Sequence, residues 1–353
     1  MKKLITAAAA VTMAACLAAC GTTAAVSEAS STAASGDSAS SAADSASSAA
    51  TADNAGKSYR IAIVQQLDHA SLDEIRKAIE AELDAKAAAQ GITVEYTEFN
   101  GQNDTSTLNQ IGTQVVNDKY DAIIPIATLA AQCMVNAATD SQTPVIYAAI
   151  SDPAAAGLTD LPNVTGTSDA LNTGFILDMM LAANPNVKTV GLLYSNSEAN
   201  STTPIADAKK YLDGKGIAYV EKTGNTADEI LAAVSSMTDK VDAVFTPTDN
   251  VVMASAAAVS EALTAAKIPF YTGADSFVEA GAFATCGVNY TDLGTTTADM
   301  ALDVLATGSF PAYHVMDGGI ITVNSDTAAA LGLDISVFNS MAGTVKTVKT
   351  SAQ

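Results

Sequence analysis

The 353-residue sequence has no tryptophan and few basic residues. Its 17 lysines and arginines stand against 38 aspartates and glutamates, which gives a formal net charge of −21. Arginine occurs only at Arg60 and Arg76. Nucleic-acid binding requires clustered lysine and arginine to neutralise phosphates, so this composition argues against it. A hydrophobic content of 48% over this length is enough for the cores of two domains.

Groups that carry catalysis are also scarce. The two histidines, His69 and His314, are far apart in the sequence. There is no G-x-S-x-G turn, no His/Cys/Glu cluster with metal spacing and no glycine-rich phosphate loop after the first predicted strand. Cys133 and Cys286 lack CxxC spacing and are expected to be buried free thiols, with a disulfide as the alternative. The sequence therefore predicts no enzyme, no metal site and no cofactor.

The N-terminal segment has the pattern of an export signal. Two lysines precede an apolar stretch over residues 4–19, which is short for a membrane span. It ends in Leu-Ala-Ala-Cys-Gly at residues 17–21, which resembles a bacterial lipobox. That resemblance implies cleavage before Cys20 and lipidation of its thiol; an ordinary signal peptide with an incidental cysteine is the alternative.

The segment after Cys20 is poor in residues that could form a core. Residues 22–56 are mostly Ser, Ala, Thr, Gly and Asp, with no aromatic residue. Such a segment cannot bury enough apolar surface to fold, so we expect a flexible tether. The domain that follows is expected at the extracytoplasmic face of the cell membrane, held there by the lipid on Cys20.

From residue 58 onward, short β-branched runs alternate with helical patterns. A predicted strand at 241–245, for example, is followed by a polar turn at 246–250 and a predicted helix at 251–266. This alternation is typical of βαβ units and parallel sheets. The pattern restarts after residues 163–169, so we predict an α/β fold with two doubly wound parallel-sheet lobes. Little pattern is seen past Phe338.

Polar residues follow many of the predicted strands, at the end where open α/β sheets bind ligands. A free amino acid needs a carboxylate, such as Asp249 or Asp275, for its ammonium group. Its carboxylate needs hydroxyls, such as those of Thr128, Ser151 and Ser168, and the N–H groups of a helix N-terminus. Helix capping is the structural alternative for each aspartate. These residues predict a cleft for a small polar molecule.

Several motifs connect the chain to a known family. They include Ile-Val-Gln-Gln at residues 63–66, Ala-Thr-Leu-Ala-Ala-Gln at 127–132, Ser-Asp-Pro at 151–153, Asn-Val-Thr-Gly-Thr-Ser-Asp at 163–169 and Pro-Thr-Asp-Asn at 247–250. With them, the chain from residue 59 to about 333 resembles the substrate-binding lipoproteins of ABC importers in the tryptophan/tyrosine-binding family. The resemblance implies a type I periplasmic-binding-protein fold, with a three-crossover hinge that closes the lobes on a ligand.

The resemblance also implies a function. We expect a monomeric, extracytoplasmic solute-binding lipoprotein that holds a small amino-acid-like ligand, expected to be aromatic, in the interlobe cleft and delivers it to the permease and ATPase subunits of an ABC importer. A ligand-sensing lipoprotein, or a binder of a sugar or nucleoside, is the alternative. The expected ligand-binding residues are Gln65, His69, Thr128, Ala130, Ser151, Asp152, Ser168, Asp169, Ser195, Glu198, Asn200, Asp249, Asn250 and Asp275.

These expectations combine into one domain organisation. The chain is expected to contain a signal peptide at 1–19, lipidated Cys20 with a tether to residue 57, an N-terminal lobe at 58–168 plus about 290–317, a C-terminal lobe at 169–289 plus about 318–338, and a tail at 339–353.

Overall fold

The computed structural model describes residues 56–351, which belong to one compact unit. The predicted signal peptide, Cys20 and the tether up to residue 55 lie outside the described residues. Among the helices of residues 56–351, none has the length and apolar character to cross a membrane.

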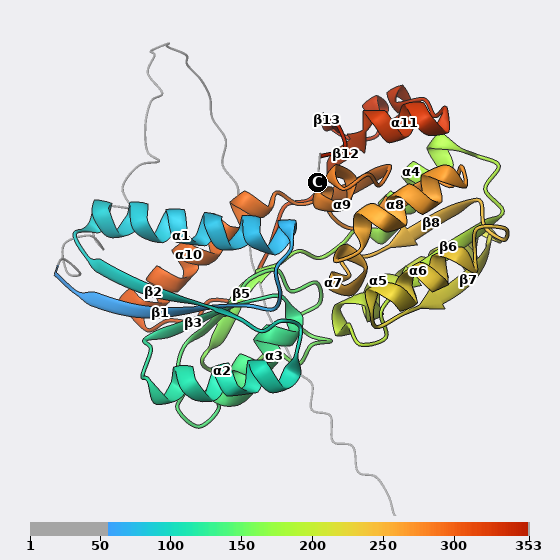
Figure 1. Ribbon diagram of the computed structural model, residues 1–353. Coiled ribbons are helices and arrows are strands. Elements are labelled where there is room, and N and C mark those ends of the chain that lie inside the picture. The colour runs from blue at the N-terminus through green and yellow to red at the C-terminus, as the bar shows by residue number, and fades with distance from the viewer. Residues whose placement is uncertain (1–55, 352–353) are drawn as a thin grey trace, which may run out of the picture. The chain divides into compact units, whose positions relative to one another are not determined.

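The first lobe, as defined here, is a six-stranded parallel sheet with its helices, in the strand order β11-β5-β4-β3-β1-β2. Helices α1 (Ala70–Gln90) and α10 (Tyr290–Thr307) cover one face, and α2 (Thr105–Asn117) and α3 (Thr128–Ala138) cover the other (Figure 1). The strands are β1 (Ser58–Gln65), β2 (Thr93–Asn100), β3 (Ala122–Ile126), β4 (Val145–Tyr147), β5 (Val164–Ser168) and β11 (His314–Val315).

The second lobe is a seven-stranded sheet with its helices, in the order β13-β12-β10-β9-β8-β6-β7, and its pairs are parallel except β10 with β12. Helices α4 (Thr173–Ala183) and α5 (Thr202–Lys215) share one core, and α6 (Ala227–Ser235), α7 (Asn250–Met253), α8 (Ala256–Ala265) and α9 (Asp275–Glu279) share the other. The strands are β6 (Thr189–Tyr194), β7 (Ala218–Thr223), β8 (Ala243–Thr246), β9 (Phe270–Thr272), β10 (Ala284–Gly287), β12 (Ile320–Asn324) and β13 (Thr344–Val348); α11 is Ser325–Leu331, and two 3-10 helices, η1 and η2, span Ala199–Ser201 and Ile335–Ser340.

The chain passes between the two sheets three times: from β5 to α4, from β10 to α10, and from β11 to β12. The predicted fold class, α/β with parallel sheets, is confirmed. The helices α1 and α10 of the first lobe can pack closely because α10 carries Gly294, where a Cβ would lie 2.6 Å from the backbone oxygen of Ile75. The first two passes leave β5 and β10 at their carboxyl ends, the ends at which the predicted site residues lie.

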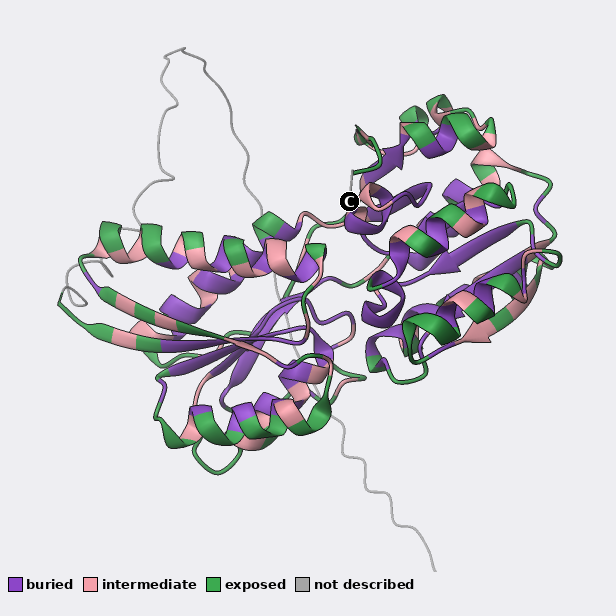
Figure 2. Cartoon of the chain, in the orientation of Figure 1, coloured by how far each residue is buried: buried purple, intermediate pink, exposed green. Residues whose placement is uncertain are grey.

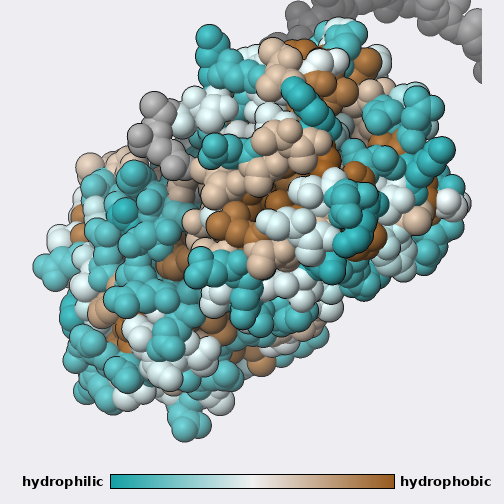
Figure 3. Space-filling view, turned by 45° about the vertical axis from the view of Figure 1, so that its right-hand side comes forward, coloured by the Kyte–Doolittle hydropathy of each residue, from teal (hydrophilic) through white to brown (hydrophobic). Residues whose placement is uncertain are grey.

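The central strands are buried on both faces, as Figure 2 shows by their purple colour. This is the pattern of a parallel sheet between two helical layers. On the surface, Figure 3 shows mainly teal and white residues, with a tan and brown area near the middle of this face. Among the described residues, Val315 is the one large hydrophobic side chain that is exposed.

Three details differ from the sequence-based prediction. Residues 164–168, which were not predicted as a strand, form β5, and all of them are buried. The pattern was obscured by Gly166, which the strand needs because a Cβ there would lie 2.1 Å from the Tyr147 oxygen in β4. The expected helix at 251–266 is split into α7 and α8 at Ser255, whose hydroxyl bonds back to the Val251 and Val252 carbonyls. Past Phe338, β13 pairs with β12.

Candidate functional site

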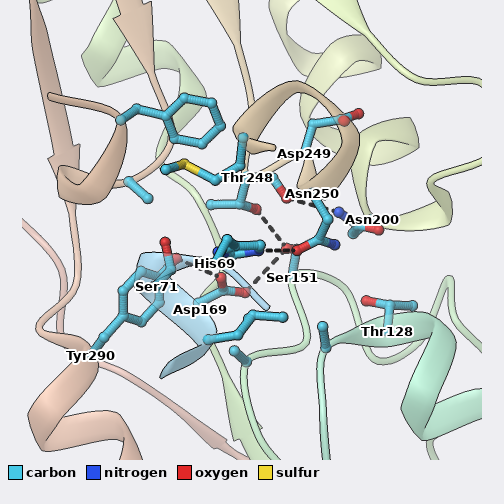
Figure 4. Close-up of a pocket in the computed structure, with 16 residues that line it drawn as sticks. His69, Ser71, Thr128, Ser151, Asp169, Asn200, Thr248, Asp249, Asn250 and Tyr290 are labelled. Carbon is cyan, nitrogen blue, oxygen red and sulfur yellow. Dashed lines mark hydrogen bonds between the residues drawn. The ribbon is translucent and has the colours of Figure 1, made fainter. Parts of the chain in front are cut away.

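A cavity lies where the carboxyl ends of strands from both sheets meet (Figure 4). The first-lobe wall consists of His69, Ser71, Leu72, Ala127, Thr128, Ala149, Ser151, Asp169 and Tyr290; the second-lobe wall consists of Asn200, Thr248, Asp249, Asn250, Met253, Ala274 and Phe277.

His69 is at the N-cap position of α1, but its side chain does not cap that helix. Its ring points into the cavity region instead (Figure 4), with Nε2 2.9 Å from Asn250 Oδ1. Nδ1 is buried and has no hydrogen-bond partner among the described residues. Burial lowers the pKa of His69, against smaller opposite effects of the Asn250 bond and of Asp73 and Asp68. The lowered pKa favours the neutral form of the ring, and Nδ1 is unused by the protein.

Thr128 begins α3 and contributes a second unpartnered atom. Its Oγ1 is buried and has no partner among the described residues. The preceding Ala127 has φ 76° and ψ 163°, a strained backbone conformation for a residue with a Cβ, and has no side chain that could cap the helix. The N–H of Leu129 donates to Gln66 Oε1 at 3.0 Å. The first-turn N–H groups of Thr128 and Ala130 have no acceptor within the helix, so this end suits an anion.

Asp169 is a buried carboxylate at the end of β5. Its Oδ1 accepts from the Ser151 hydroxyl at 3.1 Å and its Oδ2 from the Tyr290 hydroxyl at 3.2 Å. Burial raises the pKa of Asp169 above its ordinary value, and these two hydrogen bonds offset only part of that rise. None of the lysines and arginines among residues 56–351 forms an ion pair with it. A buried carboxylate without a cationic partner is favourable for a ligand that brings a positive charge.

Asp249, on the second-lobe wall, uses its carboxylate differently. Oδ1 accepts from the Val252 N–H at 3.0 Å, and Oδ2 accepts from the Ser195 N–H and the Ser201 hydroxyl at 2.7 Å each. It thus caps α7 and ties together two loops of its own lobe. The expected pairing of a ligand ammonium with Asp249 fits this geometry less well than a pairing with Asp169, because three donors of the protein reach the Asp249 carboxylate and two reach that of Asp169.

The two lobes also contact each other through side chains. Gln66 Nε2 of the first lobe donates to Glu198 Oε1 of the second at 3.1 Å. Within the second lobe, Asn250 Nδ2 donates to Glu198 Oε2 at 2.6 Å. Burial, with the neighbouring Asp249 carboxylate, raises the pKa of Glu198 to about 7. Further bonds across the cleft join Ser151 to Thr248 (3.1 Å), Thr203 to Asp152 (2.7 Å) and Ser71 to Ser276.

The structure places half of the predicted site residues on the cavity wall. These are His69, Thr128, Ser151, Asp169, Asn200, Asp249 and Asn250. The other seven lie outside it. Glu198 and Asp152 bond across the cleft, Gln65 bonds to Asp73 and Arg76, and Ser195 bonds to Asp249 and Asn225. Ser168 accepts from the Ala170 N–H, Ala130 is in the first-lobe core, and Asp275 forms an ion pair with Lys346.

The apolar part of the wall was not predicted from the sequence. Leu72, Met253, Phe277 and Tyr290 each lie in the first turns of a helix that follows a strand-end loop. Apolar side chains are more often part of the core than of a binding site, so these four were not predicted as site residues. The usable signal was position, because a residue one turn beyond a strand-end loop lies beside that loop.

The described residues contain no group of three or more His, Cys, Asp or Glu residues that could hold a metal ion. Cys133 and Cys286 are buried and free, as expected.

The fold and the cavity together define a two-lobed solute-binding protein of the type I periplasmic-binding-protein class. The sequence model of the ABC transporter substrate-binding protein family matches residues 60–342. The chain belongs to this family, whose members bind solutes and are not enzymes. Family membership places the chain outside the cytoplasm.

Three relatives refine this assignment. The chain is 34% identical over 285 residues to a tyrosine-binding protein of Clostridioides difficile (strain R20291), which covers 78% of this chain and 82% of the relative. A crystal structure from Streptococcus pneumoniae in complex with L-Trp matches with a TM-score of 0.74 and 34% identity, over 83% of this chain and 100% of that one. The ligand-free, open structure of a substrate-binding protein with adhesive properties from Clostridium difficile matches with a TM-score of 0.63 and 33% identity, over the same shares.

Proposed function

We propose that this protein binds an aromatic amino acid in the interlobe cavity and delivers it to the permease of an ABC importer. The observation that carries the proposal is the first-lobe wall. It combines an unpaired buried carboxylate, Asp169, with two buried polar atoms that lack partners, His69 Nδ1 and Thr128 Oγ1. Such a set matches a ligand that has both a cationic and an anionic end.

The two ends of an amino acid fit different parts of this wall. Its ammonium group pairs with Asp169, since a buried charge requires an opposite one. Its carboxylate accepts from Thr128 Oγ1 and from the uncapped N–H groups at the start of α3. This assignment replaces Asp249 and Asp275 with Asp169 as the ammonium partner.

The side chain of the ligand is bound by the apolar residues. Leu72 and Tyr290 come from the first lobe, and Met253 and Phe277 come from the second. Phe277 and Tyr290 offer ring surfaces, and aromatic pairs contribute about 0.5–1.5 kcal/mol beyond area burial. An aromatic side chain therefore gains more here than an aliphatic one. The names of the tyrosine-binding and L-Trp-bound relatives support the same class of ligand.

Closure of the hinge would complete the site. The hydrogen bonds between the lobes, such as Gln66 to Glu198, support a closed arrangement. At nearly equal identity, the higher TM-score to the L-Trp complex than to the open, ligand-free structure supports it too. Ligand contacts from both walls would then stabilise the closed state over the open one.

The cell-surface setting is part of the proposal. We place a signal peptide at residues 1–19, a lipid on Cys20, a tether to residue 57, and the two lobes with the boundaries given above, except that the first lobe includes Asp169 and the second includes β13. The lipid would hold a monomeric domain near the permease. Metabolic labelling with a radioactive fatty acid tests this part, because a Cys20→Ala variant should lose the label.

A thermal-shift screen tests ligand binding. The compact unit, residues 49–353, is refolded to remove carried-over ligand and mixed with L-tyrosine, L-tryptophan, L-phenylalanine, sugars and nucleosides. An aromatic amino acid at a hundredfold excess over Kd should stabilise it by about 2.7 kcal/mol. Stabilisation by a sugar or nucleoside alone would overturn the proposed ligand class. Fluorescence of bound tryptophan provides confirmation, because the protein has no tryptophan of its own.

A further inference from the structure

The hydrogen bonds around Glu198 have directions that their chemistry determines. The Leu129 N–H can only donate, so the Gln66 atom 3.0 Å from it is the amide oxygen Oε1. Gln66 Nε2 therefore faces the other way and donates to Asn103 Oδ1 at 2.8 Å and to Glu198 Oε1 at 3.1 Å. Glu198 thus accepts from Gln66 at Oε1 and from Asn250 at Oε2, which is the pattern of an ionised carboxylate.

The hydrogen bonds between Glu198, Asn250 and His69 have fixed directions too. Because the Glu198 carboxylate can only accept, Asn250 turns its Nδ2 towards Glu198 Oε2 at 2.6 Å. Its Oδ1 then faces His69 Nε2 at 2.9 Å, so Nε2 must carry the hydrogen and donate it. A neutral imidazole has one N–H, so Nδ1 has a free lone pair. Nδ1 of His69, a cavity-lining residue, is buried and has no partner among the described residues.

We propose that Glu198 and Asn250 are positioning residues that hold His69 in its Nε2–H tautomer, so that Nδ1 accepts a hydrogen bond from the ammonium group of the ligand. This inference rests on the proposed amino-acid function and deepens it. The ammonium group has three N–H donors, and Asp169 does not use all of them. A ligand that lacks an ammonium group leaves Nδ1 buried without a donor, which counts against it.

The arrangement depends on closure, because the series of bonded residues begins and ends in the first lobe and passes through the second. Gln66 and His69 belong to the first lobe, and Glu198 and Asn250 belong to the second. Opening the hinge removes Asn250 Oδ1 from His69 Nε2 and releases the tautomer. The acceptor for the ammonium group is therefore set in the same movement that encloses the ligand.

The charges near these groups fit the assignment. Glu198 faces Asp249 and the amides of Gln66, Asn200 and Asn250, with no cation among the groups that affect it. His69 faces Asn250 and, more weakly, Asp73 and Asp68. Since burial raises the pKa of Glu198 to about 7, the carboxylate form is best examined at pH 8.

Nitrogen-15 NMR reads the tautomer directly. The chain has two histidines, so a His314→Gln variant assigns the signals of His69. At pH 8 with saturating L-tyrosine, we expect His69 to carry its hydrogen on Nε2, with an Nδ1 signal shifted by a hydrogen bond. Asn250→Leu should allow the Nδ1–H tautomer to appear. An Nδ1–H tautomer in the wild-type complex overturns the proposal.

Ligand selectivity tests the role of Nδ1. The ratio of affinities for L-tyrosine and for its deaminated analogue, 3-(4-hydroxyphenyl)propanoate, should fall about tenfold or more in His69→Phe, the size of one hydrogen bond to a charged group. It should fall less in Asn250→Leu and not at all in His314→Gln, the matched control. An unchanged ratio in His69→Phe overturns the proposal. So does a change confined to the preference for L-tyrosine over L-phenylalanine, which would place the phenol at Nδ1.

Different results would contradict the proposed function and the proposed role of His69. If the wild type binds none of the three aromatic amino acids, the proposed function fails and the ammonium assignment falls with it. If it binds them while the selectivity ratio or the tautomer contradicts the expectation, only the role of His69 is wrong.

Discussion

The two walls of the cavity carry similar polar residues but leave them in different states. On the first-lobe wall, His69 Nδ1 and Thr128 Oγ1 are buried without partners, and Asp169 has no cation. On the second-lobe wall, Asp249 is held by three donors of its own lobe, and Asn250 is held between Glu198 and His69. The first wall is incomplete without a ligand, whereas the polar groups of the second are satisfied within the protein.

The comparison shows that an aspartate at the end of a strand has no single role. Asp169 and Asp249 both follow the carboxyl end of a parallel strand, β5 in the first sheet and β8 in the second. What separates them is the number of N–H and O–H groups that reach each carboxylate. Recognition is therefore assigned to the first wall, and the second wall contributes closure and apolar cover from Met253 and Phe277.

The largest expected effect is that of Asp169→Asn on binding. Removing one partner of a buried charge pair costs about 3–5 kcal/mol, so affinity for L-tyrosine should fall at least about a hundredfold. The amide can still accept from Ser151, so the melting temperature of the free protein should change little. Titration calorimetry measures the loss, and an affinity within threefold of wild type would remove Asp169 from the site.

Asp249→Ala should have the opposite profile. It removes the cap of α7 and leaves donors of Ser195 and Ser201 without their acceptor, so the free energy of unfolding should fall by about 3 kcal/mol. Urea denaturation of the free protein measures this. A variant of unchanged stability that loses binding would reverse the roles assigned to the two walls.

Thr128→Val tests the unpartnered hydroxyl at nearly constant shape. Affinity for L-tyrosine should fall about tenfold, since one hydrogen bond to a carboxylate is lost. The free protein should be as stable as wild type or slightly more stable, because a buried hydroxyl without a partner is removed. Ser201→Ala, whose hydroxyl bonds to Asp249, is the control and should lose stability instead.

The smallest effects are those of pH. Glu198, with its pKa raised from 4.5 to about 7, contributes stability that is present below pH 4.5 and lost as pH rises through 7. His69, with a lowered pKa, contributes stability that is present above pH 6.5 and lost as pH falls below it. Between pH 5 and 8, the melting temperature of Glu198→Gln should therefore increase relative to that of wild type as pH rises. The melting temperature of His69→Phe should increase relative to that of wild type as pH falls. Parallel curves for all three proteins would contradict these shifts.

Much of the fold could be predicted because it depends on local pattern. Alternating apolar runs and helical spacing indicated the parallel sheets, and strand-end polar residues indicated the cleft. The strand β5 was missed since its glycine and hydroxyl residues are typical of a loop, and only its neighbour Tyr147 shows why Gly166 is needed. The role of Asp249 could not be predicted, because its donors Ser195 and Ser201 come from residues about fifty positions away. Met253 and Phe277 were hidden among helical residues that looked like core.

One titration tests the central claim that the first-lobe wall recognises both ends of an amino acid. The refolded compact unit is titrated with L-tyrosine, with tyramine, which lacks the carboxylate, and with 3-(4-hydroxyphenyl)propanoate, which lacks the ammonium group. The account predicts that L-tyrosine binds and that each analogue binds at least about tenfold more weakly, as expected for a lost charged hydrogen bond. Equal binding of L-tyrosine and either analogue would contradict it.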